Sequence, residues 1–510
     1  MFTPLHRRWG RLIGALDAIP DTIRLVVSAD DERGGREALE NICHQATMPT
    51  RVDGGQGVDI STLDSSLRLA QDPKTIRHLA RPPVISGCIK LLGAAVAQRR
   101  RFGSPFRYEY GYLCLRLLVA SVNVCLLDRY TQLDEALEAC EENDEYAADY
   151  LASVALGSMV ESQFQITHSG INTTWDSGWA LPNPEEGPLV PRSDLSTLLG
   201  LLWNDRKFII ATSGFSGLLF LLSQHVFREK YMHKNPDGEK LKRRMYELAL
   251  RYLLVAERSQ RGATLRAIDA NHPDSEGWSR NAKHVDAEDS RLLMTALIKR
   301  LPIEDDRSVF VTREPSVMFR LITISTDPET QDLLPGAIRC AIEYGWAMLF
   351  GMNIDQDQRF QGTARTVFGI LTQFVCPTHN PESTYLLEPG ARAEILTALR
   401  DSELLDLAAC MIVDLNPTES GATDWYRSHY NKCLHFWFQF AQLLGLAPII
   451  EEKTHMSCSN ARCPMGSMND AVEFGCSGYA GGYCNDQCQS ISWRFGKRPE
   501  FHMEIGEEGD

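Results

Sequence analysis

Apolar residues recur at steps of three and four along most of the chain. The clearest series lies within 62–160 and comprises Tyr112, Leu115, Leu118, Val119, Val122 and Leu126. This spacing places apolar side chains along one wide face of an α-helix. No alternation of apolar and polar residues is long enough to indicate a sheet. The pattern therefore predicts a mostly α-helical protein.

Turn-forming residues divide this helical pattern into blocks. A first helix is expected at 34–46, and Pro82-Pro83 should begin another that runs to about Gln98. Residues 161–194 carry repeated Gly and Pro with little period, which predicts a long loop. The polar stretch 266–285 is the expected boundary between a first helical block, 1–265, and a second, 286–446.

Four short apolar strings that begin with small or turn-forming residues recur in these blocks, at 86–92, 214–222, 335–342 and 402–407. Each follows a shorter helix and a turn, and each opens a longer apolar helix. The strings loosely resemble the start of the last helix in armadillo-type repeats. That resemblance implies an irregular array of stacked helices, in which each helix pair buries its apolar face against its neighbours.

The C-terminal segment 458–502 differs from the rest because it is rich in cysteine and polar residues. Four residues separate Cys458 from Cys463, and three separate Cys484 from Cys488. A short polar segment lacks the apolar surface needed to fold alone. Two closely spaced cysteine pairs can place four thiolates around one tetrahedral zinc, whose binding supplies the missing folding energy. We therefore predict a Cys₄ zinc site here.

The surroundings of these cysteines resemble the MYND-type zinc finger. The similarity rests on Tyr483-Cys484, on Cys488-Gln489 and on Trp493, and it covers residues 458–500. In that family the cysteine pairs interleave: the first and third bind one zinc, and the second and fourth bind another. The resemblance therefore assigns one zinc to Cys458, Cys463, Cys484 and Cys488.

The second site of the family pattern is degenerate in this chain. It keeps Cys476, but Tyr479 stands at the partner position, and Gly496 and Glu500 replace the final His and Cys. The prediction is thus one zinc per chain, with Cys476 as a vestigial ligand. Two alternatives stay open: Glu500 and His502 could complete a second site with Cys476, or the finger could hold no metal.

Fingers of this family bind short, often proline-containing peptides of partner proteins. The resemblance assigns this role to Gln489, through its amide, and to Trp493, through its indole face. The alternative is that Trp493 packs against the helical body. The chain would then contact no peptide through this residue.

Charge and composition restrict the partners. The net charge of −15 over 510 residues disfavours nucleic acids and anionic membranes, and the segment 503–510 is an acidic tail. The apolar runs 113–127 and 215–222 are too short to cross a bilayer or are interrupted by Arg116. No secretory signal is evident, and the nine cysteines outside the tail are scattered like buried thiols. We expect an intracellular protein, cytoplasmic or nuclear, of unassigned oligomeric state.

Candidate sites in the helical body are weaker. His429 and Cys433 share a helix face, with His435 near, but a metal site there would need more ligands from elsewhere. Cys376 lies three residues before His379, and this pair stands alone at a helix end. The nucleophile-elbow, P-loop and HExxH patterns are absent. The sequence therefore predicts a zinc-binding adaptor or scaffold and not an enzyme.

Two alternatives to the adaptor remain. The finger could be a purely structural cap of the helical body. The chain could also be an enzyme of the SET lysine methyltransferase type, which some such fingers accompany, although a strand-rich region and an Asn-His-x-Cys motif are both lacking.

Overall fold

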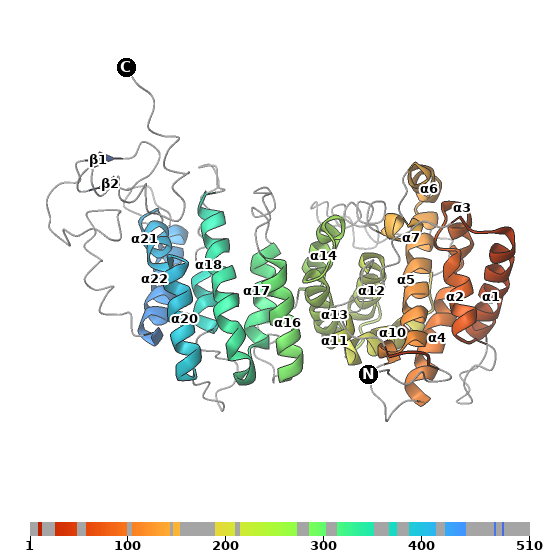
Figure 1. Ribbon diagram of the computed structural model, residues 1–510, viewed down its shortest axis with the longest axis horizontal. Helices are drawn as coiled ribbons and strands as arrows, with labels where there is room; N and C mark the ends of the chain where they lie inside the picture. Colours follow the sequence, from red (N-terminus) through yellow and green to blue (C-terminus); the bar gives the residue numbers. More distant parts are fainter. Residues whose placement is uncertain are drawn as a thin grey trace, which may run out of the picture. The chain divides into compact units, whose positions relative to one another are not determined.

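The computed structural model describes residues 9–12, 26–47, 58–98, 105–142, 146–152, 189–209, 215–272, 285–301, 314–350, 367–374, 387–414, 424–444, 474–475 and 482–483. The chain divides into two compact units, Met1–Trp278 and Ser279–Asp510. Over the described residues the protein is mostly α-helical, as the hydrophobic pattern predicts (Figure 1). The division lies inside the polar stretch 266–285, although helix continues to Ala270, five residues beyond the predicted end of the first block at 265.

Unit 1 is a succession of helices that pack on neighbours in sequence, such as α4 with α5, and on helices further along the chain, such as α1 with α4 and α2 with α5. Its longer helices are α1 (Ala29–Thr47), α2 (Ile60–Arg68), α4 (Pro82–Gln98), α5 (Glu109–Arg129), α6 (Leu133–Glu141), α10 (Arg192–Asn204), α12 (Ser216–Phe227), α13 (Gly238–Leu253) and α14 (Arg258–Ala270). Its short elements are α3 (Pro73–Ile76), η1 (Arg77–Leu79), η2 (Pro105–Arg107), α7 (Ala147–Tyr150), α11 (Arg206–Ile209) and η4 (Arg228–Met232).

Helix α5 is a deeply buried helix of unit 1. The sequence pattern predicts one apolar face, but side chains all round the helix are buried, including Leu113, Leu117, Val124 and Leu127. A helix that is apolar on every side belongs inside a protein. It contacts α2, α4, α6 and α12. The single-face expectation was wrong because neighbours pack on several sides of α5.

The α1–α4 contact explains one of the small-residue strings. Gly87 of α4 lies against the backbone of α1, where an added Cβ would collide with the carbonyl oxygen of Ile42 and lie 2.9 Å from its Cγ2. Glycine thus lets the two helix backbones approach closely. Gly93, one and a half turns later on α4, has no heavy atom within 4 Å of such a Cβ.

Helix starts in unit 1 follow local chemistry. Asp59 accepts the Thr62 amide at 2.9 Å and forms a capping box with it at the start of α2. Asp72 caps α3 by accepting the Lys74 amide at 2.9 Å, and Pro73 occupies the first helical position.

Unit 2 contains α16 (Ala287–Arg300), α17 (Glu314–Ser325), η6 (Pro328–Leu333), α18 (Leu334–Phe350), a helical segment at 367–374, α20 (Pro389–Asp401), α21 (Leu404–Asp414) and α22 (Asp424–Leu444). Contacts again join near neighbours: α16 with α17, α18 with α20, and α21 with α22. Among the aromatic residues of α22, Trp437 and Phe440 are buried, whereas Phe438 is 45% exposed.

Two short strands lie in the C-terminal segment. β1 (Phe474–Gly475) and β2 (Gly482–Tyr483) pair antiparallel, with Phe474 opposite Tyr483 and Gly475 opposite Gly482. A two-stranded pairing of this length has little stability of its own in water.

Helix α5 is long and apolar enough to cross a membrane by length and composition, despite Arg116. However, 89% of its most apolar 18-residue window is buried within the protein. The core helix of a water-exposed domain has the same properties. The apolar composition of α5 is therefore explained by its packing inside unit 1.

Candidate functional site

The residues of the predicted zinc finger lie outside the described part of the structure. This applies to the four proposed ligands, to the vestigial Cys476, and to the proposed peptide-contact residues, namely Cys458, Cys463, Cys484, Cys488, Gln489 and Trp493. Glu500 and His502 lie outside it as well. The one-zinc assignment and its alternatives therefore stay predictions.

The weaker candidates in the body do not assemble into a metal site among the described residues. Cys433 is buried and His435 is exposed, while the side chain of His429 and both Cys376 and His379 are outside the described set. Within that set, no group of three or more His, Cys, Asp or Glu side chains could hold a metal ion.

The scattered cysteines behave as core residues. Eight are described, none in a disulfide: Cys43, Cys88, Cys114, Cys125, Cys140 and Cys433 are buried, and Cys340 and Cys410 are half-buried. Burial raises the pKa of Cys125 to about 12 and that of Cys340 to about 11. A thiol with so high a pKa stays protonated and is a poor nucleophile or metal ligand.

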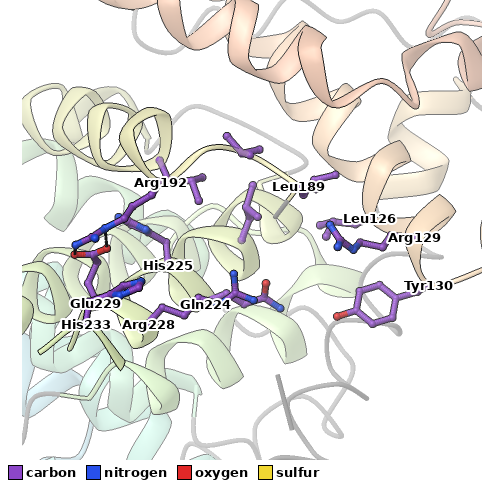
Figure 2. A pocket seen from close by; sticks show the side chains of 13 residues that line it. Leu126, Arg129, Tyr130, Leu189, Arg192, Gln224, His225, Arg228, Glu229 and His233 are labelled. Atoms are coloured by element: carbon purple, nitrogen blue, oxygen red, sulfur yellow. Dashed lines mark hydrogen bonds and ion pairs between the residues drawn. The ribbon is translucent and has the colours of Figure 1, made fainter. Parts of the chain in front are cut away.

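A cavity of about 150 Å³ lies in unit 1 (Figure 2). It lies among the end of α5, residues 189–190, the start of α10, the end of α12 and the π-helix η4. Its polar lining is Arg129, Tyr130, Arg192, Gln224, His225, Arg228, Glu229 and His233, and its apolar lining is Leu126, Leu189, Val190, Leu195 and Leu221.

Backbone geometry directs two of these elements toward the cavity. Helix α5 ends at Arg129, and Thr131 just beyond it has a φ of +58°, while the Gln132 amide donates to the Leu127 carbonyl at 2.9 Å. Helix α12 runs directly into η4, where the His233 amide donates to the Arg228 carbonyl at 2.9 Å in the π pattern. The extra residue in this turn shifts the side chains that follow. Such π-turns are frequent at functional sites.

Glu229 anchors one side of the cavity. Its side chain is 2% exposed and accepts hydrogen bonds from Arg192, through both Nε and Nη2, with Nη2 at 2.7 Å from Oε2. Asn235 Nδ2 donates to the same oxygen at 2.7 Å. The bonds from Arg192, more than any other contact, hold the pKa of Glu229 below its usual value. Glu229 is therefore ionised, and its charge is engaged with that of Arg192.

His225 lies beside this pair on α12. Its Nε2 is 3.2 Å from Ser196 Oγ on α10. Burial lowers the pKa of His225; the charge of Glu229 opposes this effect, and the charges of Arg192 and Arg228 add to it. The ring is consequently neutral at pH 7.

Arg228 and Tyr130 face each other on the other side of the cavity. Figure 2 shows the Arg228 and Gln224 side chains extending toward the Tyr130 hydroxyl, with Arg129 next to that ring. Gln224 and Tyr130 are hydrogen-bonded, and burial raises the pKa of Tyr130, so the hydroxyl keeps its proton. Burial, and then the positive charge of Arg129, lower the pKa of Arg228. Two guanidinium groups thus lie close enough to repel each other.

The electrostatic balance of the lining is positive. Three of the lining residues are arginines, and Glu229 is the one carboxylate among them. That carboxylate is paired with Arg192. The site offers guanidinium, phenol and amide donors around a small cavity, a set suited to holding an oxyanion.

Comparisons of the chain with known protein families, with curated proteins and with solved structures found no match.

Sequence reasoning singled out none of the polar lining residues. Arg129, Arg192 and Arg228 are far apart along the chain and belong to no motif. One local signal was available: Gln224 and His225 follow the apolar run 215–222 after a single serine, within the same helix, and both are buried. Buried polar side chains at the end of an apolar helix need partners, and so mark a site.

Proposed function

We propose that this protein is a zinc-binding scaffold for protein–protein contacts, with a C-terminal finger that binds one zinc and recognises short peptide segments. The observation that carries the proposal is the cysteine spacing at Cys458, Cys463, Cys484 and Cys488. Four thiolates form a suitable donor set for tetrahedral zinc. The proposal includes no catalytic step.

The short strand pair β1–β2 supports a folded finger. Tyr483 of β2 directly precedes Cys484, and Gly475 of β1 directly precedes Cys476. Strands of two residues do not hold together alone, so the pairing calls for an additional cross-link. Zinc binding contributes on the order of 10 kcal/mol or more to such segments.

The helical body supports the scaffold part of the proposal. Within each unit, helices contact their neighbours in sequence and helices a few elements further along the chain, which is compatible with a stacked helical array. We propose an irregular armadillo-like arrangement inside each unit. Arrays of this kind present extended surfaces to partner proteins.

Metal analysis of the purified full chain, prepared without a metal-binding tag, tests the zinc proposal. We expect one zinc per chain in the wild type, none after Cys484→Ser, and one after the matched change Cys476→Ser. Two zincs in the wild type, or none, would contradict the assignment. Loss of zinc in Cys476→Ser would show that the vestigial site is the occupied one.

Peptide recognition is tested separately. A library of proline-containing peptides is screened against the wild type and against Trp493→Ala, with zinc content measured in both. We expect binding to be lost in Trp493→Ala while zinc is retained, because the indole supplies a stacking face for proline.

The structural-cap alternative predicts a different result. No peptide is then selected by the wild type, and removal of zinc by a chelator lowers the melting temperature of unit 2. For the peptide-binding finger, chelation abolishes peptide binding and leaves the helical units folded.

A further inference from the structure

Arg228 has a half-buried side chain that calls for an anionic partner. It begins η4 and lines the cavity of unit 1. Among the described residues it makes no side-chain hydrogen bond or ion pair. The described carboxylate of the lining, Glu229, is already bonded to Arg192 and Asn235. Arg129 also lines the cavity but interacts elsewhere, so its charge is not assigned to a ligand. Holding the Arg228 guanidinium partly out of water is unfavourable unless an anion compensates its charge.

His225 brings a second polar group to the same cavity. It is 4% exposed, and its Nε2 is 3.2 Å from Ser196 Oγ. No other hydrogen bond of the ring is found among the described residues. Because the ring is neutral at pH 7, a Ser196 hydroxyl that donates to Nε2 leaves the ring proton on Nδ1. Nδ1 is then a buried donor in need of an acceptor, which a ligand oxygen in the cavity supplies.

The hydroxyl of Tyr130 is a third donor. Burial raises the pKa of Tyr130, and the hydrogen bond with Gln224 opposes this shift, as a bond donated to the phenol oxygen does. Gln224 is therefore the donor in that bond, and the phenol keeps its own O–H for an acceptor in the cavity. In Figure 2 the Arg228 side chain also extends toward this hydroxyl.

Apolar side chains form the rest of the wall. Val190, Leu195 and Leu221 line the cavity and are 1%, 7% and 5% exposed. An apolar wall beside one guanidinium suits a ligand that has an aliphatic part and a single anionic group. A cavity of about 150 Å³ holds a molecule of roughly benzene's size, so the aliphatic part must be short.

We propose that this cavity binds a small aliphatic monocarboxylate. Arg228 donates two parallel hydrogen bonds to the two carboxylate oxygens, since a guanidinium fork matches that geometry. His225 and Tyr130 donate to the remaining lone pairs, and the alkyl part lies against Leu195 and Leu221. A phosphoryl dianion would need a second cation to balance its charge. The proposal does not depend on the zinc finger.

Titration calorimetry of the full chain with butyrate at low ionic strength tests the proposal. We expect one saturable event per chain in the wild type and binding at least about tenfold weaker in Arg228→Gln, since a charge-assisted hydrogen bond contributes more than a neutral one. Arg77→Gln, which removes an exposed arginine of unit 1 paired with Asp134 at 2.7 Å, should bind like the wild type. Absence of saturable binding in the wild type, or unchanged affinity in Arg228→Gln, overturns the proposal.

Two milder variants keep the test valid if Arg228→Gln does not fold. Arg228→Lys retains the charge and loses the forked geometry, so it should bind butyrate several-fold more weakly than the wild type. Tyr130→Phe removes one donor and should also weaken binding several-fold. Wild-type affinity in both folded variants overturns the proposal.

Other ligands test the two parts of the assignment. n-Butanol has the same chain without the charge, and acetate has the charge without the chain, so both should bind more weakly than butyrate. If n-butanol binds as tightly as butyrate, or inorganic phosphate binds more tightly, the carboxylate assignment is wrong.

A last titration distinguishes a free acid from the carboxyl end of a peptide, which carries the same group. N-acetylvaline represents the peptide end and is larger than butyrate, so it should bind more weakly in a cavity of about 150 Å³. If N-acetylvaline binds more tightly than butyrate, the site takes a chain terminus and the small-molecule assignment is wrong.

Discussion

The ion pair between Arg251 and Glu247 is buried in the interior of unit 1. Both lie on α13, one turn apart, with side chains 0% and 1% exposed. Arg251 donates from Nε at 3.0 Å and from Nη2 at 2.9 Å to Glu247 Oε1. Removing the arginine alone would leave a carboxylate buried without its main partner, which is a far larger perturbation than loss of a surface contact.

The structure sets the size of the effect of Arg251→Met. Breaking a buried ion pair on one side costs about 3–5 kcal/mol. Arg206 Nε lies 4.0 Å from Glu247 Oε1 and keeps part of the compensation, so the loss should be near the lower end, about 3 kcal/mol. For a unit of this size, that corresponds to a fall in melting temperature of roughly 6–12 °C.

Scanning calorimetry of the full chain measures the shift, and hydrogen exchange of the α13 amides assigns the transition to unit 1. The matched control is Arg68→Met, which breaks an exposed pair with Asp31 and should cost at most about 1 kcal/mol. The double change Glu247→Leu with Arg251→Met should recover most of the loss, because no buried charge is left uncompensated. The reasoning is refuted if Arg251→Met has the same melting temperature as Arg68→Met. It is also refuted if the double variant melts at a lower temperature than either Glu247→Leu or Arg251→Met alone.

Three further predictions concern unit 1. Burial lowers the pKa of His225, so the unfolded chain binds the proton more readily than the folded chain does. The free energy of unfolding should therefore decrease as pH falls through about 6.5. In urea titrations from pH 7 to 5, His225→Gln should show a smaller dependence of this free energy on pH. Gly87→Ala should cost about 1–3 kcal/mol by overpacking against α1, while Gly93→Ala, in open space on the same helix, should be neutral or slightly stabilising in the same titrations. Tyr252→Phe should cost about 1–3 kcal/mol in thermal unfolding, because the buried Phe215 amide, which donates to that hydroxyl at 3.0 Å, would lose its acceptor.

Only part of the site could be predicted from the sequence. The cysteine tail can be recognised in the sequence because metal ligands are of few residue types and have regular spacing, so that a local pattern is enough to predict a metal site. The cavity of unit 1 cannot be predicted from the sequence, because Arg129 comes from the end of α5 and Arg228 from a π-turn after α12. Their approach depends on how α5 and α12 pack, and nothing in either segment alone records it.

By itself the sequence determined that the chain forms helices, and roughly where many of them begin. The predicted start of a helix at Pro82 agrees with the start of α4 in the structure, since helix periodicity and end signals depend on neighbouring residues only. Tertiary structure alone decided that α5 is buried on every side, that Arg251 is an interior charge, and that two arginines share a cavity. These properties arise from contacts between residues distant in sequence, where the free energy depends on which surfaces meet.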